Sequence, residues 1–282
     1  MTQPVTAHPT SELVRRLSER RRPLPSLYSG NVRAVLERGL IAIRRQNWAI
    51  VASGFFEPVF YLLSMGVGMG GLVGSVAVVG GQEVSYAAYI APALLATSAM
   101  NGAIYDSTWN VFFKMHFAKL YQGMLSTSLG PVDVALGEIM LALMRGLLYA
   151  VGFMAVIAMM GLVASPWALL MVPMAVLVAF GFASFGMGVT SWMKTFQQMD
   201  LINFILLPMF LFSATLFPID VYPVAVRWFV MAMPLWHGVE VMRQLSVGRL
   251  GWTTLGHVSY FLVMTGLGLW LTTVRLRALF LR

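Results

Sequence analysis

Glu57 and Pro58 lie within the first long apolar run, where a carboxyl group and a proline are unusual and could serve a function. They follow Trp48 by nine and ten residues, which places Glu57 about 14 Å along a helix. In lipid a charge at that depth costs roughly 2.5–3.5 kcal/mol, so Glu57 should face protein or a water-filled cavity, or be protonated. Pro58 removes a helical hydrogen bond and favours a kink. Two interpretations stay open: both residues line a route through the membrane, or Glu57 makes a buried polar tie, with Arg145 as a candidate partner.

Arg145 and Asp106 are two further ionisable residues associated with apolar runs. We expect Arg145 to extend its charged end toward the inner membrane surface. Asp106 stands close to Trp109 at the expected inner end of a run, where a carboxylate costs little. With Glu57, these make three ionisable positions on three runs, which is too few for a proton relay.

A later segment combines prolines with polar residues at helical spacing. His237, Glu240 and Arg243 stand three residues apart, so neighbours among them can meet on a helix. They either satisfy one another at the membrane surface or form an outer gate or release surface. The residues that mark this expected external hairpin are Phe217, Pro218, Pro234, His237, Glu240 and Arg243.

Residue type and spacing argue against other kinds of chemistry. The chain has no cysteine, and its four histidines lack metal-ligand spacing. Residues 188–195 nearly fit a phosphate-binding loop, but Met193 stands in place of its second glycine. We therefore expect no metal, no bound cofactor and no ATP site on this chain, and no enzyme activity.

The composition is that of a membrane protein. Of the 282 residues, 59% are apolar and only 11% are charged, against about 25% charged in an ordinary globular chain. The net charge of +8 is concentrated at the start, since nine of the nineteen Lys and Arg residues precede residue 46. That placement fits a cytoplasmic segment facing anionic lipid rather than a nucleic-acid surface.

The hydropathy pattern predicts an all-α integral membrane protein with six transmembrane helices. We expect a flexible basic arm over 1–27, an amphipathic interfacial helix over 28–46, a transmembrane domain over 47–275 and a cytoplasmic tail over 276–282. In the interfacial helix, apolar residues recur at helical spacing after Asn31, a suitable N-cap. Each expected span is long enough for a ~30 Å hydrocarbon core. The spans are placed near 48–72, 86–109, 134–162, 167–191, 199–217 and 252–274.

The distribution of Lys and Arg predicts the orientation. With the N-terminus inside, fifteen of these residues fall on the cytoplasmic side and three fall outside, namely Arg227, Arg243 and Arg249. Because positive charge gathers on the cytoplasmic side, both termini should be cytoplasmic. The helical hairpin between the fifth and sixth spans should then be external.

The connection between the second and third spans has the composition of a docking element. Aromatic and apolar residues alternate there with lysines and a histidine, which predicts a short helix lying across the membrane face. A simple linker would need neither aromatics nor lysines. The candidate docking residues are Lys114, His116, Lys119, Leu120 and Tyr121.

These motifs, in their order and spacing, resemble those of type-2 ABC exporter permeases, closest to nodulation-factor and daunorubicin-type export permeases. The resemblance covers most of the chain from about residue 30. Glu57-Pro58, the run 119–128, the Phe217-Pro218 corner and the Pro-Leu-x-His-x-x-Glu-x-x-Arg pattern of 234–243 carry it. Ala93 and Ala214 depart from the family pattern, since glycine is expected at both positions.

The resemblance implies a permease subunit of an ATP-driven exporter in a cell membrane, expected to be bacterial. Such a permease pairs with a second permease chain, identical or paralogous, and with two copies of a cytosolic ABC ATP-binding subunit that hold ATP and Mg²⁺. The cargo would be amphipathic, lipid-linked, glycan or drug-like. Residues 111–128 would be the segment on which the ATP-binding subunits press.

Two other classes of protein remain as alternatives. An ion-gradient-driven secondary transporter predicts inverted repeats and a carboxylate relay. An integral membrane enzyme acting on lipid predicts a cluster of His, Asp, Glu or Ser at one membrane face. Neither pattern is visible in the sequence.

Overall fold

The computed structural model describes the backbone of residues 30–44, 48–77 and 81–280. Within these ranges, the side chains of residues 43, 44, 48–55, 57 and 280 lie outside the description. The expected arm over 1–27 also lies outside the described residues.

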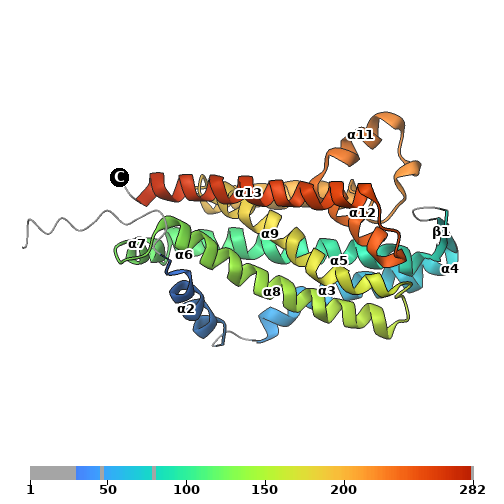
Figure 1. Cartoon of the computed structure of the whole chain (residues 1–282), viewed down its shortest axis with the longest axis horizontal. Coiled ribbons are helices and arrows are strands. Elements are labelled where there is room, and N and C mark those ends of the chain that lie inside the picture. The colour runs from blue at the N-terminus through green and yellow to red at the C-terminus, as the bar shows by residue number, and fades with distance from the viewer. Residues whose placement is uncertain (1–29, 45–47, 78–80, 281–282) are drawn as a thin grey trace, which may run out of the picture.

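The described chain is a bundle of helices with one small hairpin of two strands (Figure 1). The hairpin pairs β1 with β2 in antiparallel register, with Ser75 opposite Ser85 and Ala77 opposite Glu83. The elements in chain order are α2 (Val32–Arg44), α3 (Trp48–Gly68), α4 (Gly70–Val73), β1 (Ser75–Ala77), β2 (Glu83–Ser85), α5 (Tyr86–Tyr105), η1 (Asp106–Asn110), α6 (Val111–His116), α7 (Leu120–Leu125), α8 (Pro131–Met159), η2 (Pro166–Leu170), α9 (Met171–Thr190), η3 (Phe196–Met199), α10 (Asp200–Leu211), η4 (Ile219–Val221), α11 (Val224–Ala232), α12 (Pro234–Val247) and α13 (Trp252–Phe280).

Four helical stretches in the described residues are long and apolar enough to cross a membrane. They run over Tyr86–His116, Pro131–Met159, Pro166–Thr190 and Trp252–Leu279. The first and fifth expected spans coincide with shorter apolar helices, over Pro58–Val73 and Phe196–Leu211. The structure therefore supports an all-α membrane protein, and the count of six spans stays a prediction.

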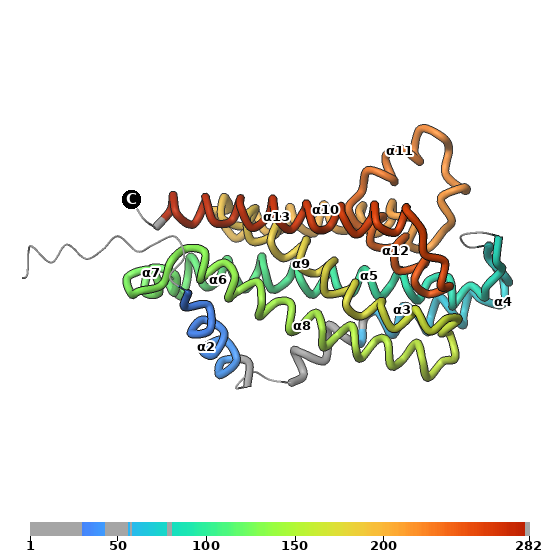
Figure 2. The backbone as a smooth tube through the Cα atoms, viewed as in Figure 1, coloured from blue at the N-terminus to red at the C-terminus, as the bar shows by residue number. Residues whose placement is uncertain are grey.

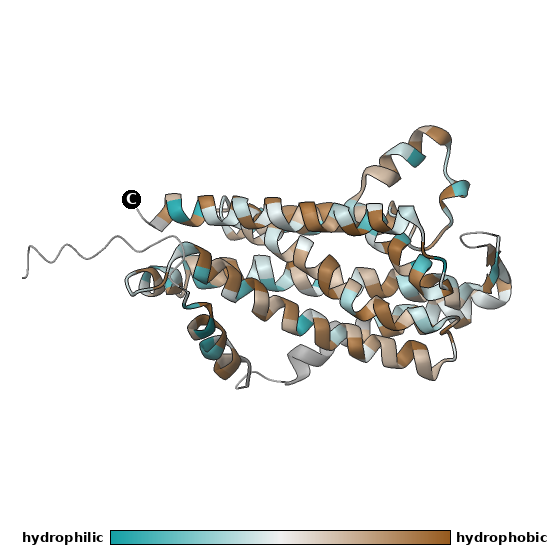
Figure 3. Cartoon of the chain, in the orientation of Figure 1, coloured by the Kyte–Doolittle hydropathy of each residue, from teal (hydrophilic) through white to brown (hydrophobic). Residues whose placement is uncertain are grey.

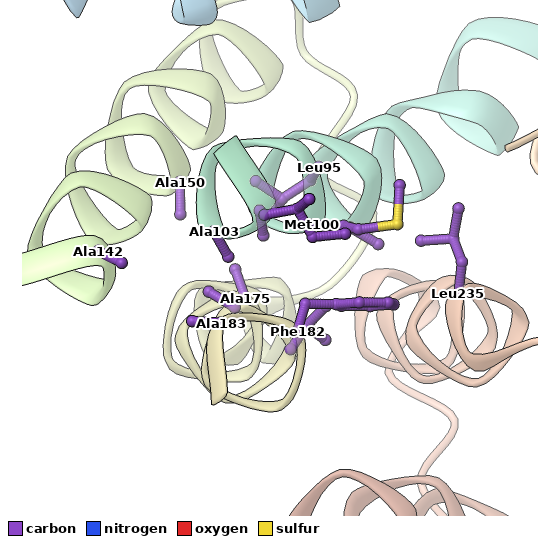
Figure 4. Close-up of a cluster of buried hydrophobic side chains, with 14 of the residues drawn as sticks. Leu95, Met100, Ala103, Ala142, Ala150, Ala175, Phe182, Ala183 and Leu235 are labelled. Carbon is purple, nitrogen blue, oxygen red and sulfur yellow. The ribbon is translucent and has the colours of Figure 1, made fainter. Parts of the chain in front are cut away.

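The interior of the bundle is built around α5. Its side chains are buried along nearly the whole helix, whereas α13 exposes large apolar residues suited to lipid. In Figure 4, Met100 of α5 lies beside Phe182 of α9 and Leu235 of α12. Small residues let the helices approach closely where they cross; they include Ala103, Ala142, Ala150, Ala175 and Ala183.

The two ends of the bundle carry different elements. Helices α2, α6 and α7 lie at the end where the chain finishes, and α4, β1 and the start of α13 lie at the opposite end (Figures 1 and 2). Hydrophobic residues follow the bundle helices, while α2 and the last turns of α13 carry hydrophilic ones (Figure 3). Helices α2, α6 and α7 and the end of α13, which the charge distribution predicts to be cytoplasmic, therefore share one end.

Helix α2 packs against α8 through two glycines. A Cβ atom on Gly137 of α8 would lie 2.5 Å from Cγ1 of Val35, and one on Gly39 would overlap the side chain of Leu141. The buried Asp133 accepts hydrogen bonds from the backbone N–H of Asn31 (3.2 Å) and of Gly130 (2.9 Å). Residue 133 thus joins the start of α2 to the start of α8.

A buried arginine holds the hairpin that the sequence predicts to be external. Helix α10 ends at Leu211, and the chain then turns through Ala214, which has a φ of 53°. One Nη of Arg243 in α12 donates to the carbonyl oxygens of Ala214 (2.6 Å) and Thr215 (3.1 Å). Its guanidinium also lies 3.9 Å from the ring centroid of Tyr89 in α5. Arg243 therefore satisfies carbonyl groups of the buried turn that follows α10.

The glycine contact between α2 and α8 gives a first prediction. Gly137→Leu should push α2 away from α8, because the new side chain would occupy the space of Val35, and overpacking of this kind costs roughly 1–3 kcal/mol. Amide hydrogen exchange over residues 32–42 should rise and the melting temperature should fall. Gly123→Leu is the control, since a Cβ there meets nothing within 4 Å. Equal effects of the two variants would contradict this packing.

The arginine clamp gives a second prediction. Arg243→Met keeps most of the side-chain volume but leaves the carbonyls of Ala214 and Thr215 without this donor, at a cost of roughly 1–3 kcal/mol. We expect a lower melting temperature and faster hydrogen exchange over residues 212–218. Arg249→Met removes an exposed arginine six residues further on and should leave both measurements unchanged. Unaltered exchange in the Arg243 variant would rule out the clamp.

Candidate functional site

A cavity of about 600 Å³ lies between α3, α5, α8 and α10. Its polar side is formed mainly by α5 and α8, and its apolar side mainly by α3 and α10. The side chains that α5 turns toward it recur at helical spacing. The cavity is lined by Pro58, Tyr61, Leu94, Thr97, Ser98, Asn101, Gly102, Ile104, Tyr105, Trp109, Arg145, Tyr149, Asn203, Leu206, Leu207 and Phe210.

An ion pair lies at this cavity. Nη1 of Arg145 is 2.9 Å from Oδ1 of Asp106, and both side chains are 10% exposed. The amide of Asn110 donates to the same oxygen at 2.5 Å. Arg145 lines the cavity, whereas Asp106 is not among its lining residues. The carboxylate therefore supports the guanidinium from outside the cavity wall.

Asp106 is buried because its helix does not end where the sequence suggested. The expected second span stops near 109, but the helix continues through the π-helical turn η1 into α6 and ends at His116. Asp106 thus lies two to three turns before the end of a continuous helix, and its place at the inner membrane surface stays a prediction. Arg145, which was expected to extend toward the inner membrane surface, pairs with Asp106 from the middle of α8.

A second ion pair joins the same two helical segments. Nζ of Lys114 in α6 lies 2.5 Å from Oε2 of Glu138 in α8. The polarity is opposite to that of the first pair, since here α8 contributes the acid. Neither Asp106 nor Glu138 was proposed as a site residue. The signal in the sequence was a complementary charge pattern. Residues 106–114 begin with an acid and end with a base, and residues 138–145 do the same. In antiparallel neighbouring helices, each acid then lies opposite a base.

Pro58 is the part of the Glu57-Pro58 prediction that can be placed. It is buried within α3 and lines the cavity. The side chain of Glu57 lies outside the described residues, so the proposed tie to Arg145 stays a prediction.

The five candidate docking residues divide into anchors and surface groups. Tyr121 is fully buried, and Leu120 is half-buried. Lys114 is engaged by Glu138 and is 29% exposed. The ring of His116 stacks on that of Phe112, with centroids 4.4 Å apart. Lys119 is exposed between α6 and α7, with a φ of 47°.

Two phenylalanines of α6 and its end were missed by the sequence reasoning. Phe113 and Phe117 are exposed and stack on one another, with ring centroids 5.5 Å apart. Their four-residue spacing in an expected helix was the available signal. With Lys119 they form the surface of the α6–α7 segment, which we call the docking surface.

His237, Glu240 and Arg243 have different partners among the described hydrogen bonds, although Glu240 and Arg243 also interact through their charges. His237 of α12 meets His257 of α13, with their Nδ1 atoms 2.9 Å apart. Glu240 accepts a bond from the amide of Gln244 at 3.4 Å. Arg243 bonds the carbonyls after α10, as described above. Each of the three residues thus has a different hydrogen-bond partner.

The remaining hairpin residues lie at the boundaries of helices. The imidazole of His237 is uncharged at neutral pH. Phe217 and Pro218 precede η4, and Pro234 begins α12. Burial lowers the pKa of His237 to about 4, and the neighbouring His257 contributes to this decrease. In the described part of the chain, no group of three His, Cys, Asp or Glu side chains could hold a metal ion.

Comparison with known proteins agrees with this architecture. Residues 30–247 match the family described as ABC-2 type transporter. The nodulation protein J of Rhizobium leguminosarum bv. trifolii is 30% identical over 250 residues, which cover 88% of this chain and 94% of that protein. The protein of the same name in R. leguminosarum bv. viciae is 30% identical over 219 residues, 77% of this chain and 82% of the relative. That of Sinorhizobium fredii is 30% identical over 227 residues, 80% and 85% of the two chains.

The resemblance inferred from the motifs is thus confirmed at the level of the family. The matched region contains the cavity and both ion pairs, together with most of the external hairpin. Its members are transport components rather than catalytic subunits, and the family implies partnership with an ATP-binding subunit. The chain is a membrane-embedded member of the ABC-2 type transporter family.

Proposed function

We propose that this chain is the transmembrane permease subunit of an ATP-driven exporter in the cell membrane. It works as a pair with a second permease chain and binds two copies of a cytosolic ATP-binding subunit, which hold ATP and Mg²⁺. Its cargo is amphipathic, lipid-linked, glycan or drug-like, and leaves the cytoplasm. No nucleotide-binding motif occurs in the sequence, so the energy for movement comes from the partner.

The observation that carries this proposal is the continuity of one helical stretch. Tyr86–His116 begins near the external hairpin, lines the cavity in its middle and ends in α6 beside the docking surface. A push on α6 is therefore transmitted along a rigid element to the cavity wall. The π-helical turn η1 lies between the two, a type of irregularity that is frequent at functional sites.

The two ion pairs extend this coupling to α8. Lys114 links α6 to Glu138, and Asp106 links η1 to Arg145. Breaking either pair would leave a buried charge without its partner, which is costly. Closure of the ATP-binding subunits against the docking surface therefore moves α5, α6 and α8 together. In this proposal, that movement opens the cavity outward.

The cavity suits an amphipathic cargo. Leu206, Leu207 and Phe210 of α10 offer an apolar wall, and Asn101 and Tyr149 offer polar groups on the opposite side. Small-molecule sites commonly combine an apolar lining with a few convergent polar groups. The cargo class stays as broad as stated above, since these groups recognise no single headgroup.

Reconstitution tests the proposed function. The chain, purified and placed in proteoliposomes with a separately encoded ATP-binding subunit, should show vanadate-sensitive ATP hydrolysis that neither protein shows alone. ATP should then drive uptake of a fluorescent amphipath into vesicles in which the docking surface faces outward. Transport driven by a proton gradient without the ATP-binding subunit would instead support a secondary transporter. Conversion of lipid without transport would support an enzyme.

Lys119 tests the docking surface. Lys119→Glu reverses an exposed charge, and exposed ion pairs contribute roughly 0.2–1 kcal/mol. We expect co-purification of the ATP-binding subunit to weaken by up to about fivefold, with an unchanged melting temperature. Lys194→Glu, at an exposed lysine between α9 and η3, is the matched control and should have no effect. Equal weakening by both variants would show that net charge, rather than this surface, determines binding.

Lys114 requires a separate prediction because it is paired. Lys114→Glu would place a second carboxylate beside the buried Glu138, and like charges in a buried site are destabilising. We expect a lower melting temperature of the isolated chain, before any partner is added. A melting temperature equal to that of the native chain would show that the Lys114–Glu138 pair contributes nothing to stability.

A further inference from the structure

We propose that Arg145 is a specificity-determining residue of the cavity, which recognises a phosphate or carboxylate group of an amphipathic ligand by exchanging Asp106 for that oxyanion. The inference rests on the proposed function only in treating the bound ligand as a cargo. The binding itself requires neither ATP nor a partner.

The charge pattern of the cavity points to an oxyanion. Of the lining residues that the structure describes, Arg145 alone carries a charge at neutral pH; the others are apolar or neutral polar. A guanidinium presents planar, paired donors that match a carboxylate or phosphate. A buried anionic headgroup would therefore find its counter-charge at Arg145, and its apolar chain would lie against Leu206, Leu207 and Phe210 of α10.

The ion pair is arranged so that its carboxylate can be exchanged. Asp106 contacts Nη1 of Arg145 but does not itself line the cavity. The same Oδ1 also accepts a hydrogen bond from Asn110 at 2.5 Å. Asp106 therefore keeps a donor when Arg145 turns to a ligand. A carboxylate left without any partner at this depth would make such an exchange too costly.

A second observation is that Ser98, which lines the same cavity, has a buried hydroxyl without a partner. Ser98 is only 3% exposed, and its Oγ has no hydrogen-bond partner in the described part of the chain. Leaving such a group unpaired costs roughly 1–3 kcal/mol. Ser98 and Asn101 share the cavity face of α5, and Asp106 follows Ser98 by about 12 Å of helix. If the oxyanion of a ligand bound Arg145, the neighbouring polar atoms of that ligand would lie near Ser98 and Asn101.

The competing explanation is that Asp106 and Arg145 only hold η1 to α8, as Lys114 and Glu138 hold α6 to α8. The two explanations predict opposite effects of neutralising Asp106 on the binding of an oxyanion. If Arg145 binds the ligand and Asp106 competes for it, neutralising the aspartate should strengthen oxyanion binding. If the pair is only a structural tie, neutralising either residue should weaken the cavity in the same way.

Direct binding to the full chain tests the proposal. The chain is placed in nanodiscs of phosphatidylcholine and bound with radiolabelled octyl phosphate, octanoate or octyl glucoside, with subtraction of binding to empty nanodiscs. Arg145→Gln should weaken octyl phosphate and octanoate about tenfold, the effect of losing one charge-assisted hydrogen bond. Asp106→Asn should strengthen both several-fold. Octyl glucoside should bind equally to all variants.

Arg227→Gln is the matched control, because it removes an arginine that pairs with an aspartate, Asp220, outside the cavity. It should leave binding of all three probes unchanged. Oxyanion binding that is unaltered by Arg145→Gln, or lowered alike by Arg145→Gln and Asp106→Asn, would overturn the proposal. So would a parallel loss of octyl glucoside binding and melting temperature in the Arg145 variant, since this is the result of a collapsed cavity.

The two oxyanion probes distinguish the headgroup, because their apolar chains differ by only one carbon atom. Tighter binding of octyl phosphate assigns the site to phosphate, and tighter binding of octanoate assigns it to carboxylate. The assay contains no ATP-binding subunit, so a failure of ATP-driven transport leaves its result intact. Conversely, ATP-driven transport that is normal in Arg145→Gln, for cargo of every charge, would contradict this inference and leave the proposed exporter standing.

Discussion

The Asp106–Arg145 ion pair is the interaction on which the arrangement of this protein depends. Within a lipid-embedded bundle, water is not available to compensate a charge, so each charged group must find its partner on another helix. The pair joins η1 to the middle of α8 beside the cavity. It also explains why the helix from Tyr86 to His116 can carry an acid in its interior.

The same constraint governs the opposite end of the bundle, which carries the hairpin between α10 and α13. Helix α10 stops at Leu211, and the turn that follows leaves carbonyl groups that water cannot reach freely. Arg243 satisfies two of them from α12, and the hydroxyl of Tyr86 bonds the carbonyl of Leu216 at 3.3 Å. An arginine that would read as a surface charge in the sequence is thus an internal clamp. The external hairpin owes its position to hydrogen bonds rather than to apolar burial alone.

The sequence predicted the helices well, because long apolar runs and flanking tryptophans are local signals. It predicted the partners of polar residues poorly, because these are not local. Asp106 meets a residue thirty-nine positions away, and His237 meets His257 across the turn between α12 and α13. The continuation of this helix past residue 109 was missed for a related reason, since the π-helical turn at 106–110 has no periodicity signature of its own. The sequence therefore indicated Arg145 and Lys114 as candidate site residues, but not Asp106 and Glu138, with which they pair.

Helix α8 is where these separate features meet. Gly137 packs against Val35 of α2, and the next residue, Glu138, forms an ion pair with Lys114 of α6. Two turns further along, Arg145 reaches the cavity. A rigid helix brings all three contacts within about 12 Å. Because α2, α6 and the cavity wall all contact one short stretch of α8, a displacement of α2 or α6 would be passed on to the cavity wall. Packed helices shift between discrete arrangements rather than deform continuously, so this stretch of α8 is suited to convert a push from outside the membrane into a change of cavity shape.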